Sequence, residues 1–236
     1  MPREALQEIS QTIAAVGSVQ RGGFVVGPSD TVPEVKAGQP ANTLMLLGNA
    51  GPEMWKRFDE ARTHQRMTLD EWSEAVIGEL ADKLGARPLF PFSKPYLPCQ
   101  TWAQRAEACF VSPIGMSIHP SYGLWHAYRG ALAFAERLDV PQYPLAISPC
   151  ETCVDQPCLT SCPVEAFSRS GYDTMACTGH LASAAGADCL SQGCLARRAC
   201  PVGREFTYEP AQGAISYRRI PKDQSQGLGG KISLPL

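Results

Sequence analysis

The residues of this chain best suited to chemistry are eight cysteines between positions 150 and 200. A [4Fe–4S] cluster needs four thiolates, and closely spaced cysteines on one loop can supply three of them. In two-cluster ferredoxins the cysteine before a proline serves the other cluster, and the Cys-Pro pairs at 162–163 and 200–201 fit that exchange. We therefore expect two [4Fe–4S] clusters, held by separate sets of cysteines. The first set is Cys150, Cys153, Cys158 and Cys200, and the second is Cys162, Cys177, Cys189 and Cys194.

The spacing also bears on two alternative roles for these cysteines. The first run reads C-x2-C-x4-C-x3-C-P, so its middle gap is longer than the x2 of bacterial ferredoxins. Structural zinc uses four cysteines as well, but typically in C-x2–4-C pairs and without a preference for proline after the last cysteine. The spacing therefore favours iron–sulfur clusters over zinc. A disulfide framework is typical of secreted chains, and residues 1–17 show no export signal. Cys99 and Cys109 lie outside the pattern and are expected to be buried small residues.

The composition indicates a folded protein that binds no nucleic acid and no membrane. The chain has 236 residues, of which 44% are hydrophobic, a formal net charge of −2 and a pI of about 6.1. A nucleic-acid-binding protein would show a basic excess, and a membrane span would need roughly 20 consecutive apolar residues. Residues 1–17 instead have the apolar spacing of an amphipathic helix. We expect a soluble, cytoplasmic protein.

Hydrophobic periodicity and turn residues predict mixed strands and helices before the cysteines. Thr68 and Glu71 have the spacing of a capping box, and Gly85 is a typical helix end. Four prolines between 87 and 98 exclude a helix interior or a central strand there. Strands are expected at 21–27 and 43–48, and helices at 1–17, 52–63, 68–84 and around 101–110.

A proline-rich linker at 140–149 separates the two domains that we expect. Residues 1–140 would form an α+β domain, residues 148–210 would hold the clusters, and residues 211–236 would be a C-terminal tail. A simple electron carrier needs only the cluster domain. The first 140 residues therefore require a role of their own.

The segment Ile118–Gly130, with the sequence IHPSYGLWHAYRG, resembles the signature of CblC-type cobalamin-processing proteins. That signature runs I-H-P, an aromatic residue, Gly, a Trp two places on, and A-x-R-G. Weaker similarity in TLMLL at 43–47 and PEM at 52–54 extends the resemblance over about residues 45–135. The resemblance implies a nitroreductase-like cobalamin-binding domain.

The same resemblance implies which residues surround the cobalamin; no catalytic residue is assigned. Arg129 would lie at a polar site beside the corrin, and Trp125 would pack on the corrin or its upper ligand, unless it is a core tryptophan. His119 is expected to be structural, because the family is thought to bind cobalamin without a protein ligand. Glycines would allow the backbone to approach a bulky ligand closely. The expected cofactor-binding residues are Gly115, Ile118, His119, Pro120, Tyr122, Gly123, Trp125, Arg129 and Gly130.

The cysteine-rich part is similar to a second group of proteins. Epoxyqueuosine reductases and reductive dehalogenases join a cobalamin-binding domain of nitroreductase-like fold to a two-[4Fe–4S] ferredoxin-like module. They too carry an isolated cysteine between two cysteine groups, as Cys177 is here. Both resemblances thus imply the same cofactor.

Together they imply a cobalamin-binding iron–sulfur reductase that reduces cobalamin and removes its upper axial ligand, for example cyanide from cyanocobalamin. The CblC-type family has C-terminal arginines for glutathione where the cluster region stands here, which favours reductive removal over glutathione-dependent dealkylation. A low-potential flavoprotein or ferredoxin would supply the electrons. Two alternatives stay open: a cobalamin-dependent reductase of an organic substrate, and a ferredoxin-type carrier whose first domain docks a partner. The short N-terminal domain disfavours the former.

Overall fold

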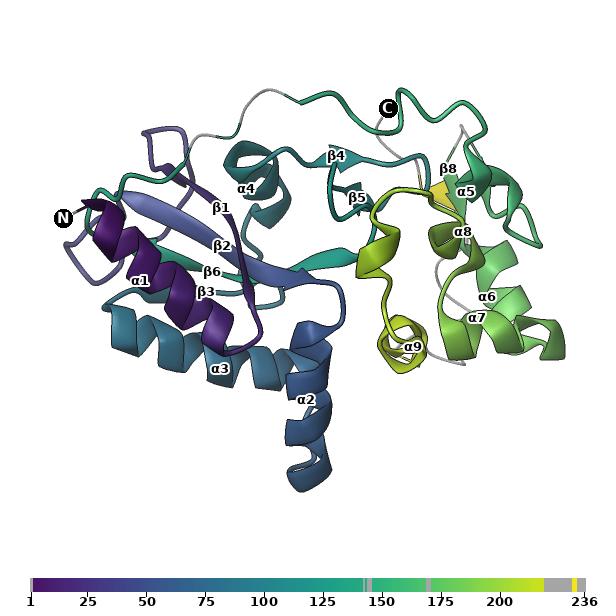
Figure 1. The fold of residues 1–236 in the computed structure, drawn as a ribbon, viewed down its shortest axis with the longest axis horizontal. Coiled ribbons are helices and arrows are strands. Elements are labelled where there is room, and N and C mark those ends of the chain that lie inside the picture. Colours follow the sequence, from purple (N-terminus) through teal and green to yellow (C-terminus); the bar gives the residue numbers. More distant parts are fainter. Residues whose placement is uncertain (1, 142, 144–145, 169–170, 219–230, 233–236) are drawn as a thin grey trace. The chain divides into compact units, whose positions relative to one another are not determined.

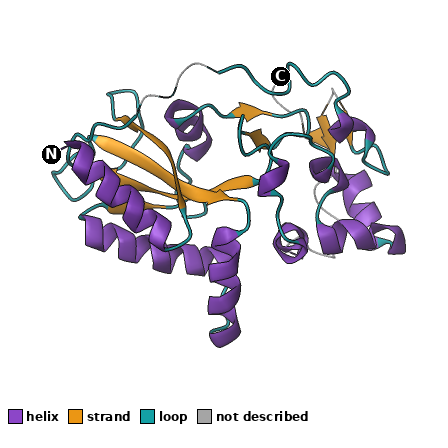
Figure 2. Cartoon of the chain, in the orientation of Figure 1, coloured by secondary structure: helices purple, strands orange, loops and turns teal. Residues whose placement is uncertain are grey.

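The computed structural model describes residues 2–141, 143, 146–168, 171–218 and 231–232, which form both helices and strands (Figures 1 and 2). The chain divides into two units. The first unit comprises residues 1–108 and 126–145, and the second comprises residues 109–125 and 146–236. Residues 109–125, which precede the expected linker, therefore group with the cysteine-rich segment. Linker residues 142 and 144–145 and tail residues 219–230 and 233–236 lie outside the described residues.

The first unit is built on a four-stranded antiparallel sheet of order β1-β2-β6-β3. Its strands are β1 (Val19–Val25), β2 (Thr43–Ala50), β6 (His126–Phe134) and β3 (Arg87–Leu89). Pro88 lies in β3, an edge strand, where a missing N–H is tolerated. The strands at 21–27 and 43–48 that the sequence predicts are thus present with slightly shifted ends.

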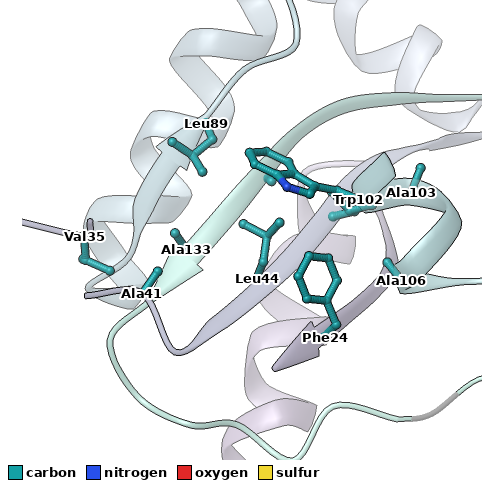
Figure 3. Packing of buried hydrophobic residues seen from close by; sticks show 11 residues of the cluster. Phe24, Val35, Ala41, Leu44, Leu89, Trp102, Ala103, Ala106 and Ala133 are labelled. Atoms are coloured by element: carbon teal, nitrogen blue, oxygen red, sulfur yellow. The ribbon is translucent and has the colours of Figure 1, made fainter. Parts of the chain in front are cut away.

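Alternating residues of the central strands β2 and β6 form two apolar layers. Leu44 and Leu46 belong to one buried cluster, with Phe24 of β1 and Trp102 of α4 (Cys99–Ala106), and Figure 3 shows the close packing of that cluster. The other cluster unites the intervening β2 residues with α1 (Pro2–Ala15) and α3 (Leu69–Leu84). Because successive side chains in a strand point to opposite faces, the two clusters lie on opposite faces of the sheet. Helix α4 packs on one face, and α1 and α3 pack on the other.

The helix ends follow local rules where capping residues are present. Thr68 Oγ1 accepts a hydrogen bond from Glu71 N at 3.2 Å, and Thr68 N donates to Glu71 Oε2 at 2.6 Å. Gly85 ends α3 with φ +65°. The predicted capping box and helix end are therefore confirmed, and α2 (Glu53–His64) precedes them.

The helix expected around 101–110 ends earlier, at Ala106. Glu107 is extended, with φ −155° and ψ 170°, and its side chain is buried in an ion pair with Arg21. The helix therefore ends at the residue before this buried ion pair.

The second unit consists of short elements around a small core that includes buried Cys158 and Cys200. Within the described parts of the chain, no helix combines the length and apolarity needed to cross a membrane. The elements before Cys189 are β4 (Phe110–Val111), β5 (Ser117–Ile118), α5 (Pro157–Thr160), β7 (Phe167–Ser168), β8 (Gly171–Asp173), α6 (Thr174–Ala182) and η1 (Ala184–Gly186). The remaining ones are α7 (Ala187–Gln192), α8 (Leu195–Arg198), η2 (Arg204–Phe206), α9 (Pro210–Arg218) and β9 (Lys231–Ile232).

Candidate functional site

Two pockets in the second unit are each lined by four cysteines. The first cysteine pocket, which has about 360 Å³ of empty space including open solvent, is lined by Cys150, Cys153, Cys158 and Cys200. The second cysteine pocket, of about 320 Å³ measured in the same way, is lined by Cys162, Cys177, Cys189 and Cys194. These are the same two groups of four that the spacing suggests.

All ten cysteines lie among the described residues, and none of them forms a disulfide bond there. Among the described residues, no three His, Cys, Asp or Glu side chains converge in a way that could hold a single metal ion. Each cysteine group lines a pocket instead. Cys109 is buried and Cys99 packs against the core of the first unit, as expected for residues outside the pattern.

Burial and mutual repulsion oppose ionisation of three thiols in the first cysteine pocket, those of Cys150, Cys158 and Cys200. Burial raises the pKa of Cys158 to about 11, and the neighbouring thiols of Cys200, Cys150 and Cys153 add to the increase. Burial also raises the pKa of Cys150 and Cys200. These three thiols become thiolates readily only beside a cation, which compensates their charge.

A hairpin of β7 and β8 places donors beside the second cysteine pocket. Ala166 N donates to Cys162 Sγ at 3.4 Å, and the Tyr172 side chain hydrogen-bonds Cys177. Burial and this hydrogen bond raise the pKa of Tyr172, so its hydroxyl keeps its proton. Burial likewise raises the pKa of Cys177, while the Tyr172 hydrogen bond acts in the opposite direction.

Each pocket also contains a buried polar side-chain atom that has no hydrogen-bond partner among the described residues. Ser112 lines the first cysteine pocket, and its Oγ is such an atom. His180 lines the second, and its Nε2 is another. Sequence reasoning missed both; the one available signal was the position of His180, three residues after Cys177 on α6.

The expected cobalamin residues of the second unit form a tight turn. His119 Nδ1 accepts hydrogen bonds from the N–H groups of Ser121 at 3.1 Å and Tyr122 at 3.2 Å, and its ring stacks on Tyr122. His119 therefore has a structural part in this turn, which includes Pro120. Gly123 has φ +56°, and a Cβ there would lie 2.0 Å from Val202 O. The turn thus packs against the loop that follows Cys200.

Trp125 closes this segment inside the second unit. It is 3% exposed, and its ring packs on Tyr208 with centroids 5.6 Å apart. The guanidinium of Arg197, from α8, lies 5.0 Å from the Trp125 ring, and Arg197 Nε donates to Leu124 O at 3.0 Å. Arg197, which sequence reasoning did not single out, therefore ties the segment to the helix between Cys194 and Cys200.

Other residues of the expected cobalamin set are distributed over both units. Arg129 and Gly130 lie in the first unit, on β6, where Arg129 Nη2 donates to Asp70 Oδ1 at 2.6 Å. A Cβ on Gly130 would lie 2.8 Å from Ile77 Cδ1, so the close approach at this glycine is to α3. Ile118 lies in the second unit and lines the first cysteine pocket, and Gly115 occupies a turn with φ +75°.

Comparison with known proteins identifies the fold. No protein-family model matches the sequence, and no curated protein sequence matches it. A selenomethionine-labelled epoxyqueuosine reductase aligns with 91% of this chain and 69% of its own, with a TM-score of 0.53 and 14% identity. The epoxyqueuosine reductase from Streptococcus thermophilus aligns with 88% of this chain and 70% of its own, with a TM-score of 0.51 and 13% identity. The chain has the fold of the epoxyqueuosine reductases.

The match to these reductases covers both units of the chain, and at this identity it establishes the fold alone. The B12-trafficking protein CblC from C. elegans aligns with 62% of this chain and 78% of its own, at 18% identity. Its TM-score of 0.41 is too low to add to the fold assignment. The combination of helices and strands that the sequence predicts is present in the structure.

Proposed function

We propose that this protein is a cobalamin-binding iron–sulfur reductase that reduces cobalamin and removes its upper axial ligand, such as the cyanide of cyanocobalamin. The observation that carries the proposal is the pair of four-cysteine pockets in a chain with the epoxyqueuosine reductase fold. Each pocket would hold one [4Fe–4S] cluster in a ferredoxin-like module.

The chemistry of both pockets fits such clusters. Four thiols line each pocket, which is the number of thiolates that a [4Fe–4S] cluster needs. Backbone N–H groups of Ala166, Leu195 and Val202 hydrogen-bond the sulfur atoms of Cys162, Cys189 and Cys200. Hydrogen bonds to sulfur are one of the means by which proteins tune cluster potentials. Ser112 Oγ and His180 Nε2, which have no hydrogen-bond partner among the described residues, suit a polyatomic acceptor in each pocket.

The cobalamin part of the proposal rests on the segment that resembles CblC-type proteins. Ile118 and Leu124 of that segment line the first cysteine pocket. A corrin bound along the segment would thus lie near the cluster held by Cys200, which favours that cluster as the immediate electron donor. Arg197 and Tyr208 would hold Trp125 in position, and apolar side chains would keep water from the first pocket.

Bound clusters would supply the low-potential electrons, since [4Fe–4S] and related clusters reach down to about −700 mV. Cyanocobalamin as substrate would accept one electron and yield cob(II)alamin and free cyanide. A low-potential flavoprotein or ferredoxin would be the reductant. The chain itself would supply the binding and orientation, as is general for cofactor enzymes.

The test uses full-length protein purified and reconstituted without oxygen. About eight iron and eight acid-labile sulfide per chain are expected, since a [4Fe–4S] cluster would form in each of the two pockets. Added cyanocobalamin should alter the visible spectrum on binding, and a reduced flavoprotein should convert it to cob(II)alamin. Zinc without sulfide would overturn the cluster assignment, and conversion at full rate by a cluster-free variant would overturn the electron route.

A second candidate function is reduction of an organic substrate with bound cobalamin. The observation that favours it is the fold match to epoxyqueuosine reductases, one of which is bound to an epoxyqueuosine-modified tRNA stem loop. The chain spans 69% of the length of the reductase with the highest of these TM-scores, so it has less chain to surround such a substrate. A carrier without cobalamin affinity is the third candidate, and an unchanged spectrum on cobalamin addition would favour it.

A further inference from the structure

We propose that Ser112 and His180 each donate a hydrogen bond to a sulfur atom of the cluster in their own pocket, and that each raises the reduction potential of that cluster alone. This inference rests on the proposed function, because it needs clusters in the two cysteine pockets. It concerns residues outside both cysteine sets and outside the CblC-like segment.

Ser112 is a buried hydroxyl in the first cysteine pocket. The residue is 4% exposed, and its Oγ has no hydrogen-bond partner among the described residues. Its backbone is held in a turn, since Ser112 N donates to Met116 O at 2.9 Å and Ser112 O accepts from Gly115 N at 2.8 Å. A buried hydroxyl without a partner costs free energy, and a sulfur acceptor in the pocket would remove that cost.

His180 is the corresponding residue of the second cysteine pocket. It lies on α6 three residues after Cys177, so both side chains share one face of the helix. Its Nε2 is buried and lacks a partner among the described residues, while the residue lines the pocket with the four thiols. An imidazole that carries its proton on Nε2 is a hydrogen-bond donor. A cluster bound in this pocket would supply a sulfur atom as the acceptor.

The rest of the second pocket keeps this geometry in place. Asp173 Oδ1 accepts from Ala176 N at 2.9 Å and caps α6. Asp173 N donates to Ala166 O at 2.7 Å, and Ala166 N donates to Cys162 Sγ at 3.4 Å. The hairpin thus links the cap of the His180 helix to one of the cysteines, and Tyr172 adds a hydrogen bond to Cys177.

The expected effect has a definite sign. Reduction adds negative charge to a cluster, and a hydrogen bond to its sulfur stabilises the reduced form more than the oxidised form. Loss of the donor should therefore make the reduction potential more negative. Because the two donors line different pockets, each substitution should shift one of the two potentials and leave the other unchanged.

The experiment measures both cluster potentials by EPR-monitored redox titration of reconstituted full-length protein. Ser112→Ala should shift one potential downward, and His180→Leu should shift the other. His180→Gln, which keeps an N–H donor, should restore much of the second shift. The matched controls are Ser117→Ala, an exposed serine of the same segment, and His64→Leu, an exposed histidine of α2. Both controls should leave both potentials unchanged.

A second measurement separates this role from a structural one. Without iron, Ser112→Ala should unfold at the same or higher denaturant concentration than the wild type, because it removes a hydroxyl that lacks a partner. Unchanged potentials in Ser112→Ala and His180→Leu, or a shift of the same cluster by both, would overturn the inference. Absence of iron and sulfide from the wild type would instead overturn the proposed function.

Discussion

At the scale of single residues, the first unit depends on a buried charge pair that sequence patterns do not indicate. The Arg21 and Glu107 side chains are 0% and 2% exposed. Glu107 Oε1 also accepts a hydrogen bond from the Tyr128 hydroxyl at 2.6 Å, and Arg21 Nη1 donates to Asn49 O at 3.2 Å. Removal of one partner from such a pair leaves an uncompensated buried charge.

We expect Glu107→Gln to lower the free energy of unfolding of the first unit by about 3–5 kcal/mol, because Arg21 stays charged and buried. Urea unfolding followed by tryptophan fluorescence would measure the change. The matched control is Glu53→Gln, which breaks an ion pair with Lys56. In that pair the Glu53 side chain is 70% exposed and the Lys56 side chain 54%. That control should cost at most about 1 kcal/mol. Equal losses in the two variants would contradict the assigned role of Glu107.

At the scale of elements, the turn at 119–123 packs closely against the loop after Cys200. Each of the two segments has a glycine at the point of contact. A Cβ on Gly123 would lie 2.0 Å from Val202 O, and a Cβ on Gly203 would lie 2.4 Å from the carbonyl carbon of Tyr122. Both glycines have positive φ, at +56° and +68°. Because Cys200 precedes this loop, the turn helps to position one cysteine of the first set.

Gly123→Ala should therefore weaken the first cluster site more than the second. The added methyl group would force the loop at Val202 to move, which displaces Cys200, and the positive φ adds strain. The measurement is iron and sulfide content after reconstitution, with EPR to identify the cluster that remains. Gly179→Ala is the control, since a Cβ on this helical glycine meets nothing within 4 Å. Normal cluster content in Gly123→Ala would show that the contact does not position Cys200.

At the scale of the whole molecule, the two cysteine sets share no residue, although they alternate along the chain. In the sequence, Cys162 lies between Cys158 and Cys200, which both line the first cysteine pocket. Cys162 itself lines the second cysteine pocket. Loss of one cluster would therefore leave the cysteine ligands of the other cluster in place.

We expect Cys150→Ser and Cys177→Ser each to retain about half of the iron and sulfide of the wild type, and to lack different EPR signals. The physical reason is that each variant removes one ligand from one pocket only. Cys99→Ser, outside both sets, should retain the full content. Complete loss of iron in both single variants would mean that the two sites assemble only together.

The sequence by itself determined the features that depend on neighbours along the chain. The capping box at Thr68 and the glycine end of α3 involve residues a few positions apart, and both are present as predicted. The continuous apolar run at 43–48 likewise predicts the strand β2, whose residues are buried on both faces of the sheet. The spacing and the Cys-Pro pairs also led to the hypothesis of two cysteine groups, and the same groups line the two pockets.

Only the tertiary structure decided the features that join distant segments. It groups residues 109–125 with the cysteine pockets, where Ser112 contributes a hydroxyl, and it ends α4 at Ala106 in favour of the Arg21–Glu107 pair. It also places Arg197 against Leu124, 73 residues away in sequence. Such contacts depend on the free energy of packing between remote segments, and a local spacing rule carries no information about which remote segments meet.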